Sequence, residues 1–247
     1  MPVERAARKP PAAMKKTARA RASTPARAER FKRPQKESLT EQAYAQIEEA
    51  IVTLQIAPGS SVSELSLSEM TGIGRTPIRE AIQRLAREHL IVILPQRGLL
   101  VPEIDVKKQL KLLRTRREVE RLVCRSAARS AAPEEREVFG QLAAEFAEAA
   151  AANDDVSFVR LDREFNELCL IAARNEFAEG AMRLMHGLSR RFWYYHYKQA
   201  ADLPEMARLH GTVAKAIAKG DVEGAGDALD ALLDNIEAFT RATLTEL

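Results

Sequence analysis

Two arginines stand at the start of an expected helix, where positive charge is unfavourable. Thr76 and Pro77 predict that the helix begins there, because a Thr hydroxyl can cap a free amide and Pro fits the first helical position. Arg75 directly precedes this helix and Arg79 lies within its first turn, although the helix dipole favours anions at that end. A guanidinium can bind guanine O6 and N7 together, or a phosphate, so both side chains are candidates for contacts with DNA. The apolar stripe that would hold this helix on a core consists of Ile78, Ala81, Ile82 and Leu85.

The residues around this helix decide between two interpretations of its arginines. In the first, the arginines belong to an ordinary solvated helix and pair with Glu80 and Glu88. In the second they contact DNA, and the preceding segment favours it. Residues 63–70 predict a short helix that Ser63 can cap, and Gly72 supplies a left-handed residue to end it. Two helices joined by a tight Gly-containing turn form a helix-turn-helix, whose second helix enters the major groove.

A small β-hairpin is expected directly after the second helix. Residues 90–94 (LIVIL) and 99–101 (LLV) are β-rich runs, and residues 95–98 (PQRG) predict the turn between them. Arg97 would lie at the tip of this wing, from which it can reach phosphate or the minor groove without entering a core.

Residues 38–102 resemble the winged-helix DNA-binding domain of GntR-type bacterial transcription regulators. The motifs that carry the resemblance occur in order: an IAPG turn, a GxxRTPIREA core and an RGxxV wing. The resemblance implies that Arg75, Thr76 and Arg79 make the base and phosphate contacts, with Gly98 at the wing.

Two positions depart from the pattern of this family. Gly74 stands where the family usually has Ser or Thr, so one capping or phosphate-binding hydroxyl is missing. His89 stands where a helix-ending Gly is usual. Because His tolerates the left-handed region better than most non-Gly residues, we expect the turn to survive.

Beyond a junction at residues 102–105, every segment is expected to be helical. Six expected helices with short connections predict an antiparallel bundle. They are placed at residues 105–131, 133–152, 155–173, 176–201, 203–219 and 221–245. This half resembles the all-helical effector and oligomerisation domain, called FCD, of the FadR subgroup. The matching segments are RREVE at 116–120, LDREFNELCLIAARN at 161–175 and HGTVAKAIAKGD at 210–221.

Arg116 is the first polar residue whose helical phase indicates a ligand site. It shares the most apolar stripe of its helix with Leu112, Val119 and Val123. An arginine on a buried stripe needs an anionic partner, because an unpaired buried charge is too costly. One candidate partner is Glu120, one helical turn on. The other is the carboxylate of an effector, which the guanidinium would anchor.

Asp162, Asn166 and His210 are the other candidate effector-binding residues. Many proteins of the resembled family bind a divalent metal through an Asp, a His four residues later and two more His on later helices. Asp162 and His210 match that pattern, but Asn166 and Leu232 replace the remaining two ligands and cannot supply an imidazole nitrogen. We therefore expect no metal cofactor, with a divalent metal as the disfavoured alternative. We expect a small anionic metabolite to bind Arg116 and these polar groups.

An aromatic-rich segment lies near the end of the fourth of these helices. Phe192 and Tyr195 share a stripe with Met185 and Leu188, so both are expected in the core. Tyr hydroxyls beside a cavity would also suit hydrogen bonds to a small organic ligand.

Charge is distributed unevenly along the chain. Residues 1–37 hold 12 Lys and Arg against 3 Glu, whereas the remaining residues hold 26 basic and 32 acidic side chains. The first segment has no apolar periodicity and is expected to be a disordered arm that adds non-specific attraction to phosphate. The folded part is acidic overall, so the basic character of the whole chain does not by itself indicate DNA binding.

Cysteine usage and hydropathy limit the class of protein. Cys124 and Cys169 lie far apart without metal-ligand spacing, which indicates reduced core thiols in a cytoplasmic protein. No apolar run approaches the length that crosses a bilayer, so no membrane partner is expected.

Together these features predict a mainly α protein in three parts. Residues 1–37 would be the basic tail, residues 38–103 a winged helix-turn-helix of three helices and a small hairpin, and residues 104–247 an all-helical effector-binding and dimerisation domain. We expect a homodimeric, sequence-specific regulator of transcription that binds double-stranded operator DNA under control of a small organic acid. The alternatives are a non-specific DNA-binding protein and, less favoured, a small helical enzyme that uses Asp162 and His210.

Overall fold

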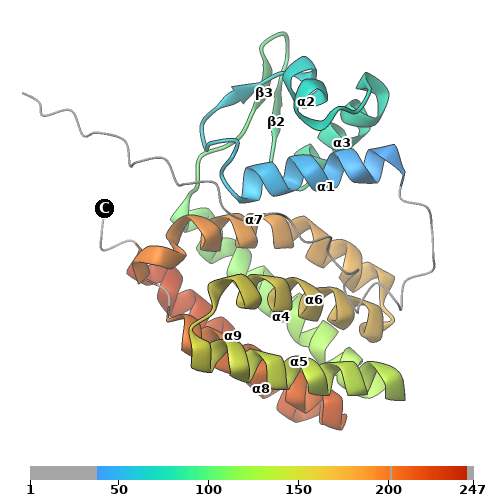
Figure 1. Cartoon of the computed structure of the whole chain (residues 1–247), viewed down its shortest axis with the longest axis vertical. Helices are drawn as coiled ribbons and strands as arrows, with labels where there is room; N and C mark the ends of the chain where they lie inside the picture. Colours follow the sequence, from blue (N-terminus) through green and yellow to red (C-terminus); the bar gives the residue numbers. More distant parts are fainter. Residues whose placement is uncertain (1–37, 201, 244–247) are drawn as a thin grey trace, which may run out of the picture.

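The computed structural model describes residues 38–200 and 202–243 (Figure 1). The predicted basic tail, residues 1–37, lies outside the described residues. Within them the protein is mainly helical, with a small antiparallel sheet near the N-terminus and a helical bundle after it, as the sequence predicted. No helix in the described part of the chain is long and apolar enough to cross a membrane.

The N-terminal part is a winged helix-turn-helix. Its elements are α1 (Leu39–Val52), β1 (Ser61–Val62), α2 (Glu64–Thr71), α3 (Arg75–Arg87), β2 (Val92–Leu94) and β3 (Gly98–Leu100). The predicted hairpin of β2 and β3 is confirmed, but β1 adds a third strand and gives the order β1-β3-β2. Ser61 pairs with Leu100 and Val62 with Leu99. The sequence did not reveal β1, because two residues are too short to show an alternating pattern.

Capping residues explain where the first two helices begin and end. Ser38 accepts a hydrogen bond from the Glu41 amide at 3.1 Å, and Ser63 accepts one from Ser66 at 3.0 Å. Gly72 then adopts φ +70°, which ends α2 as predicted.

The helix α3 begins earlier than the sequence indicated. Its first residue is Arg75, so the predicted start at Thr76 and Pro77 is wrong. Gly74 is the N-cap, and it provides no side-chain hydrogen bond. The Thr76 hydroxyl cannot cap a helix within which it already lies, since capping requires a residue that precedes the helix. His89, as expected, adopts the left-handed conformation, with φ 60°.

The second part of the chain is an antiparallel bundle of helices (Figure 1). These are α4 (Val106–Ser130), α5 (Pro133–Ala152), α6 (Asp155–Ala173), α7 (Glu176–Ala200), α8 (Leu203–Lys219) and α9 (Val222–Ala242). Their starts follow the predicted breaks, because Asp105, Asp154, Asp202 and Asp221 each accept hydrogen bonds from amides of the following helix. A core of large apolar side chains, including Phe139, Phe146 and Phe165, joins the helices.

Helix α7 faces two different parts of the molecule, which corrects the prediction for its aromatic segment. Phe192 is buried as expected, but Tyr195 is 49% exposed and is not a core residue. Leu188 packs against the core of the winged helix rather than that of the bundle. Helical phase cannot foresee this division, because a stripe gives no information about which neighbour covers it.

Replacing Gly72 by Ala should lower the free energy of unfolding by about 1–2 kcal/mol, the cost of a left-handed conformation for a residue with a Cβ. Nothing lies within 4 Å of the added methyl group, so the change tests the backbone alone. Gly140→Ala is the matched control: Gly140 is exposed inside α5 and also has open space around it. In Gly140→Ala the free energy of unfolding should rise by about 0.5–1 kcal/mol. The urea concentration at half-unfolding should therefore fall in Gly72→Ala and rise in Gly140→Ala.

Candidate DNA-binding surface and effector pocket

The first turn of α3 presents the predicted DNA-binding side chains to solvent. Arg75, Thr76 and Arg79 are all exposed. The Arg79 Nε donates to Glu64 Oε2 at 2.7 Å, but the two side chains are 66% and 41% exposed. Such a solvated pair contributes little to stability. Arg79 is therefore able to leave Glu64 for an external phosphate or base.

The expected alternative partners of these arginines are engaged elsewhere. Glu80 accepts a hydrogen bond from the Thr40 hydroxyl at 2.6 Å. Glu88 accepts from the Tyr44 hydroxyl at 2.7 Å and from Arg84 Nε at 3.1 Å. Burial and the carboxylate of Glu88 raise the pKa of Tyr44, so its hydroxyl remains a donor. Hence neither carboxylate neutralises the N-terminal turn of α3.

The wing places one arginine at an exposed tip. Arg97 lies in the turn between β2 and β3 and is exposed. Gly98, at the start of β3, has φ +90°, and a Cβ there would lie 3.3 Å from the Val62 carbonyl oxygen. Gly98 thus has a conformational role in forming the turn that carries Arg97.

A cavity of about 670 Å³ brings together the four residues predicted to bind an effector. Arg116, Asp162, Asn166 and His210 all line it, although they come from three different helices of the bundle. The cavity is also lined by residues of α1, including Glu48, so the winged helix forms part of its wall. The sequence analysis did not foresee that contribution.

Within the cavity, Arg116 binds its neighbour on the same helix. Its Nε donates to Glu120 Oε2 at 2.6 Å and its Nη2 donates to Glu120 Oε1 at 3.0 Å. Both side chains are buried. Burial would lower the pKa of Arg116, but the charge and hydrogen bonds of Glu120 raise it overall. The internal pair foreseen as one alternative is therefore present, and it occupies only part of the five-donor guanidinium.

Asp162 is the centre of a second polar cluster. Its Oδ1 lies 3.1 Å from His210 Nε2 and accepts from Asn166 Nδ2 at 3.0 Å. Burial favours a raised pKa for Asp162, but the hydrogen bond and charge of His210 lower it overall. The other ring nitrogen, His210 Nδ1, lies 2.8 Å from the Met206 carbonyl oxygen. Each ring nitrogen of His210 thus lies within hydrogen-bond distance of an oxygen. Three aromatic rings pack around the imidazole, those of Phe146, Phe158 and Phe165.

Helix α7 supplies cavity-lining side chains that the sequence analysis had not assigned to the site, among them Ser189, Trp193 and His186. Ser189 Oγ and Trp193 Nε1 are buried and have no hydrogen-bond partner in the described part of the chain. They are four residues apart, so they lie on one face of the helix. Burial, followed by the nearby charge of Arg116, lowers the pKa of His186 to about 4, which keeps this ring neutral near pH 7. The spacing of Ser189 and Trp193 was visible in the sequence, but their lack of partners was not.

The two residues that stand in place of the missing metal ligands, Leu232 and Asn166, make other contacts. Leu232 is 1% exposed and belongs to the core of the bundle. Asn166 is bound to Asp162. Among the described residues, no group of three or more His, Cys, Asp or Glu side chains is arranged to hold a metal ion. Cys124 and Cys169 are free and buried, as expected of core thiols, and burial raises the pKa of Cys169.

Zinc, nickel or manganese should therefore leave the melting temperature of the protein nearly unchanged. A ligand that binds only the native state raises stability in proportion to its occupancy, and a site with Asn and Leu in place of two imidazoles should have low occupancy. Differential scanning fluorimetry with each metal and with a chelator measures the shift. A large rise that disappears in His210→Ala would contradict this expectation and would indicate a further ligand.

Comparison with known proteins identifies the family. Residues 39–101 match the bacterial regulatory proteins of the gntR family, and residues 111–235 match the FCD domain. The chain belongs to the GntR family of helix-turn-helix regulators, in the group with an FCD domain. It is a DNA-binding transcriptional regulator and not an enzyme.

Two relatives and two solved structures show how far the similarity extends. The HTH-type transcriptional repressor RspR of Escherichia coli K12 is 26% identical over 203 residues, which cover 82% of this chain and 89% of RspR. A regulator in an unstable DNA locus of Streptomyces ambofaciens is 37% identical over 62 residues, and the chain spans only 26% of that protein. The fold is similar to that of E. coli McbR/YncC, with a TM-score of 0.68 at 20% identity over 84% of this chain and 99% of that one. A GntR regulator of Rhodococcus sp. RHA1 has a TM-score of 0.60 at 20% identity, over 82% of this chain and 97% of its own.

Proposed function

We propose that this regulator binds a specific operator as a homodimer and is controlled by a small organic acid. The observation that carries the proposal is the cavity between the bundle and α1, because a ligand there touches the DNA-binding part directly. Arg116, Asp162, Asn166 and His210 supply it with one cation and several hydrogen-bonding groups. Ligand pockets typically combine apolar walls with a few placed polar groups of this kind.

The DNA contacts in this proposal come from α3 and the wing. Arg75, Thr76 and Arg79 would enter the major groove, while Arg97 would reach the backbone or minor groove beside the wing. A dimer would place two such helices on a two-fold operator, and the effector would alter their spacing or orientation. Repression is consistent with this scheme, since RspR is a repressor.

Footprinting on the DNA upstream of the protein's own gene tests the proposal. We expect one protected two-fold site at a fixed salt concentration, and weaker protection when succinate, citrate or benzoate is added. Light scattering of the free protein should give the mass of a dimer. Uniform protection along the fragment would instead support non-specific binding, which the 12 basic residues of the N-terminal segment would favour. Protection that none of the acids alters would contradict the proposed effector class.

A further inference from the structure

Helix α7 is the surface on which the winged helix rests. It lies beside α1 in Figure 1, and the two helices are in contact. A Cβ at Gly187 would lie 2.7 Å from Leu90 Cδ1, so the absence of a side chain there permits the close approach. The neighbouring Leu188 packs against the core of the winged helix, and Arg191 donates a hydrogen bond to the Pro102 carbonyl. A change in α7 will therefore be transmitted to the DNA-binding part.

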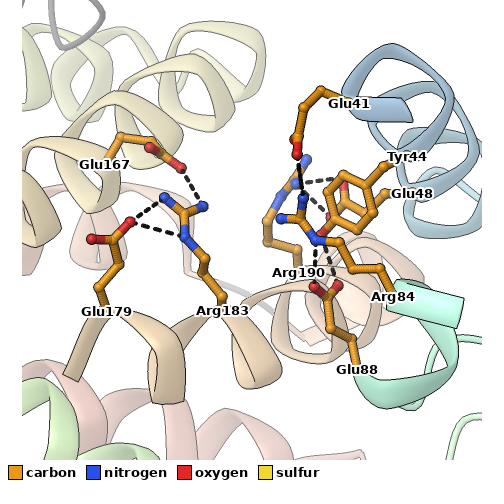
Figure 2. Close-up of polar contacts among 9 residues, drawn as sticks. All are labelled: Glu41, Tyr44, Glu48, Arg84, Glu88, Glu167, Glu179, Arg183 and Arg190. Atoms are coloured by element: carbon orange, nitrogen blue, oxygen red, sulfur yellow. Dashed lines mark hydrogen bonds and ion pairs between the residues drawn. The ribbon is translucent and has the colours of Figure 1, made fainter. Parts of the chain in front are cut away.

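Arg190 of α7 forms an ion pair with Glu48 of α1, and so connects the bundle to the winged helix (Figure 2). Its Nη1 donates to both carboxylate oxygens of Glu48, at 2.9 and 3.1 Å, and its Nη2 donates to Glu49 Oε2 at 3.2 Å. The side chains of Glu48 and Arg190 are only 12% and 26% exposed. Burial raises the pKa of Glu48, and the charge of Arg190 opposes that rise. The buried carboxylate of Glu48 thus receives both charge compensation and hydrogen bonds from Arg190.

Arg190 also lines the effector cavity, and this dual position distinguishes it from Arg116. Arg116 and its partner Glu120 lie on the same helix, so a ligand that separates them moves no domain. The carboxylates that bind Arg190 come from α1 of the winged helix. A ligand that takes Arg190 from them acts directly on the contact between the two parts.

We propose that Arg190 receives a carboxylate of the effector in exchange for Glu48. The inference rests on the proposed function and names the first contact of its ligand. The ligand class is a small carboxylic acid. Acids with a further hydrogen-bond acceptor should bind best, because Ser189 Oγ and Trp193 Nε1, on the same helix beside the cavity, have no partner among the described residues. A guanidinium binds one carboxylate with two parallel hydrogen bonds. Because Glu48 and Glu49 already occupy both terminal nitrogens of Arg190, a further carboxylate must displace Glu48 from Nη1. Binding of the acid therefore releases Glu48, which favours separation of α1 from α7.

Contacts within the winged helix connect this exchange to the recognition helix. Tyr44 lies one turn before Glu48 on α1, and its hydroxyl donates to Glu88 at the end of α3. The guanidinium of Arg84, also on α3, stacks over the Tyr44 ring at 3.6 Å (Figure 2). Since α1 and α3 are tied together by these contacts, a displaced α1 carries the N-terminal turn of α3 with it.

The test compares variants whose expected effects have opposite signs. Arg190→Gln removes the cation and should weaken binding of succinate, citrate or benzoate at least about tenfold. Glu48→Gln removes the charge that competes with the ligand for Nη1 of Arg190, while the contact with Glu49 remains. It should tighten acid binding and weaken DNA binding in the absence of acid, each by about 5–150-fold, the usual range for coupled sites. Arg190→Lys keeps the charge but loses the fork, so it should retain folding and still bind acid more weakly than wild type.

Arg183→Gln is the matched control for charge loss on α7. Arg183 pairs with Glu179 and Glu167, which both belong to the bundle (Figure 2). In the absence of acid, Arg183→Gln should bind DNA within about twofold of wild type, because both of these ion pairs lie within the bundle. A loss of DNA affinity equal to that of Glu48→Gln would overturn the specific role of the Arg190 contact.

Isothermal titration calorimetry with the three acids and a DNA-binding assay at fixed salt decide the outcome. Tighter acid binding by Glu48→Gln together with weaker binding by Arg190→Gln supports the exchange. If wild type and all Arg190 and Glu48 variants bind an acid equally, the exchange is wrong although the proposed effector class stands. If neither wild type nor Glu48→Gln binds any of the acids, the organic-acid assignment fails and the exchange fails with it.

Discussion

Arg79→Ala should abolish much of the discrimination between the operator and unrelated DNA. A bidentate contact to guanine is worth about 1–3 kcal/mol, which corresponds to roughly 5–150-fold in relative affinity. Arg79 is free to make this contact because its partner in the structure, Glu64, is itself 41% exposed. Competition between labelled operator and excess unrelated DNA at fixed salt measures the ratio.

Two controls separate base recognition from general charge. Arg87→Ala removes an exposed arginine from the last turn of the same helix and should affect the ratio much less, because its position is far from the N-terminal turn. Glu64→Gln removes the internal partner of Arg79 and should leave the discrimination intact. Wild-type discrimination in Arg79→Ala would show that the recognition residues have been assigned wrongly.

Local signals explain why the DNA-binding part was predictable from the sequence. Ser63, Gly72 and Asp105 act within a few residues of themselves, so their types alone place the ends of helices. The start of α3 shows the limit of such signals. The Thr76–Pro77 pair resembled a helix start, but Gly74, with an extended backbone and no capping side chain, was the actual boundary.

The sequence predicted those residues of the effector site that could be recognised within a single helix. Helical phase placed Arg116 on an apolar stripe, and the family resemblance selected Asp162 and His210. The structure places all three at one cavity. Neither signal gave information on Glu48 and Arg190, which meet from elements about 140 residues apart. Pairings of this kind depend on how two domains pack, and no local periodicity encodes that arrangement.

Breaking the buried Arg116–Glu120 pair should strongly reduce the stability of the protein. Arg116→Ala should lower the free energy of unfolding by about 3–5 kcal/mol, because it leaves the buried carboxylate of Glu120 without its partner. Both side chains are nearly inaccessible, at 8% and 5% exposure, so the carboxylate of Glu120 is largely desolvated when its partner is lost. Urea unfolding monitored by circular dichroism measures the change.

The double variant Arg116→Met, Glu120→Leu distinguishes a structural role of Arg116 from that of an effector anchor. Replacing a whole buried pair by apolar side chains of similar size is often neutral or stabilising, so the double variant should recover most of the stability lost in Arg116→Ala. It can then be tested for acid-induced release of DNA in a folded protein. If Arg116 anchors the effector, this response is lost, since coupling requires differential contact in the two states. A stable double variant with a normal acid response would limit Arg116 to pairing with Glu120, and would leave Arg190 as the cation through which the acid acts.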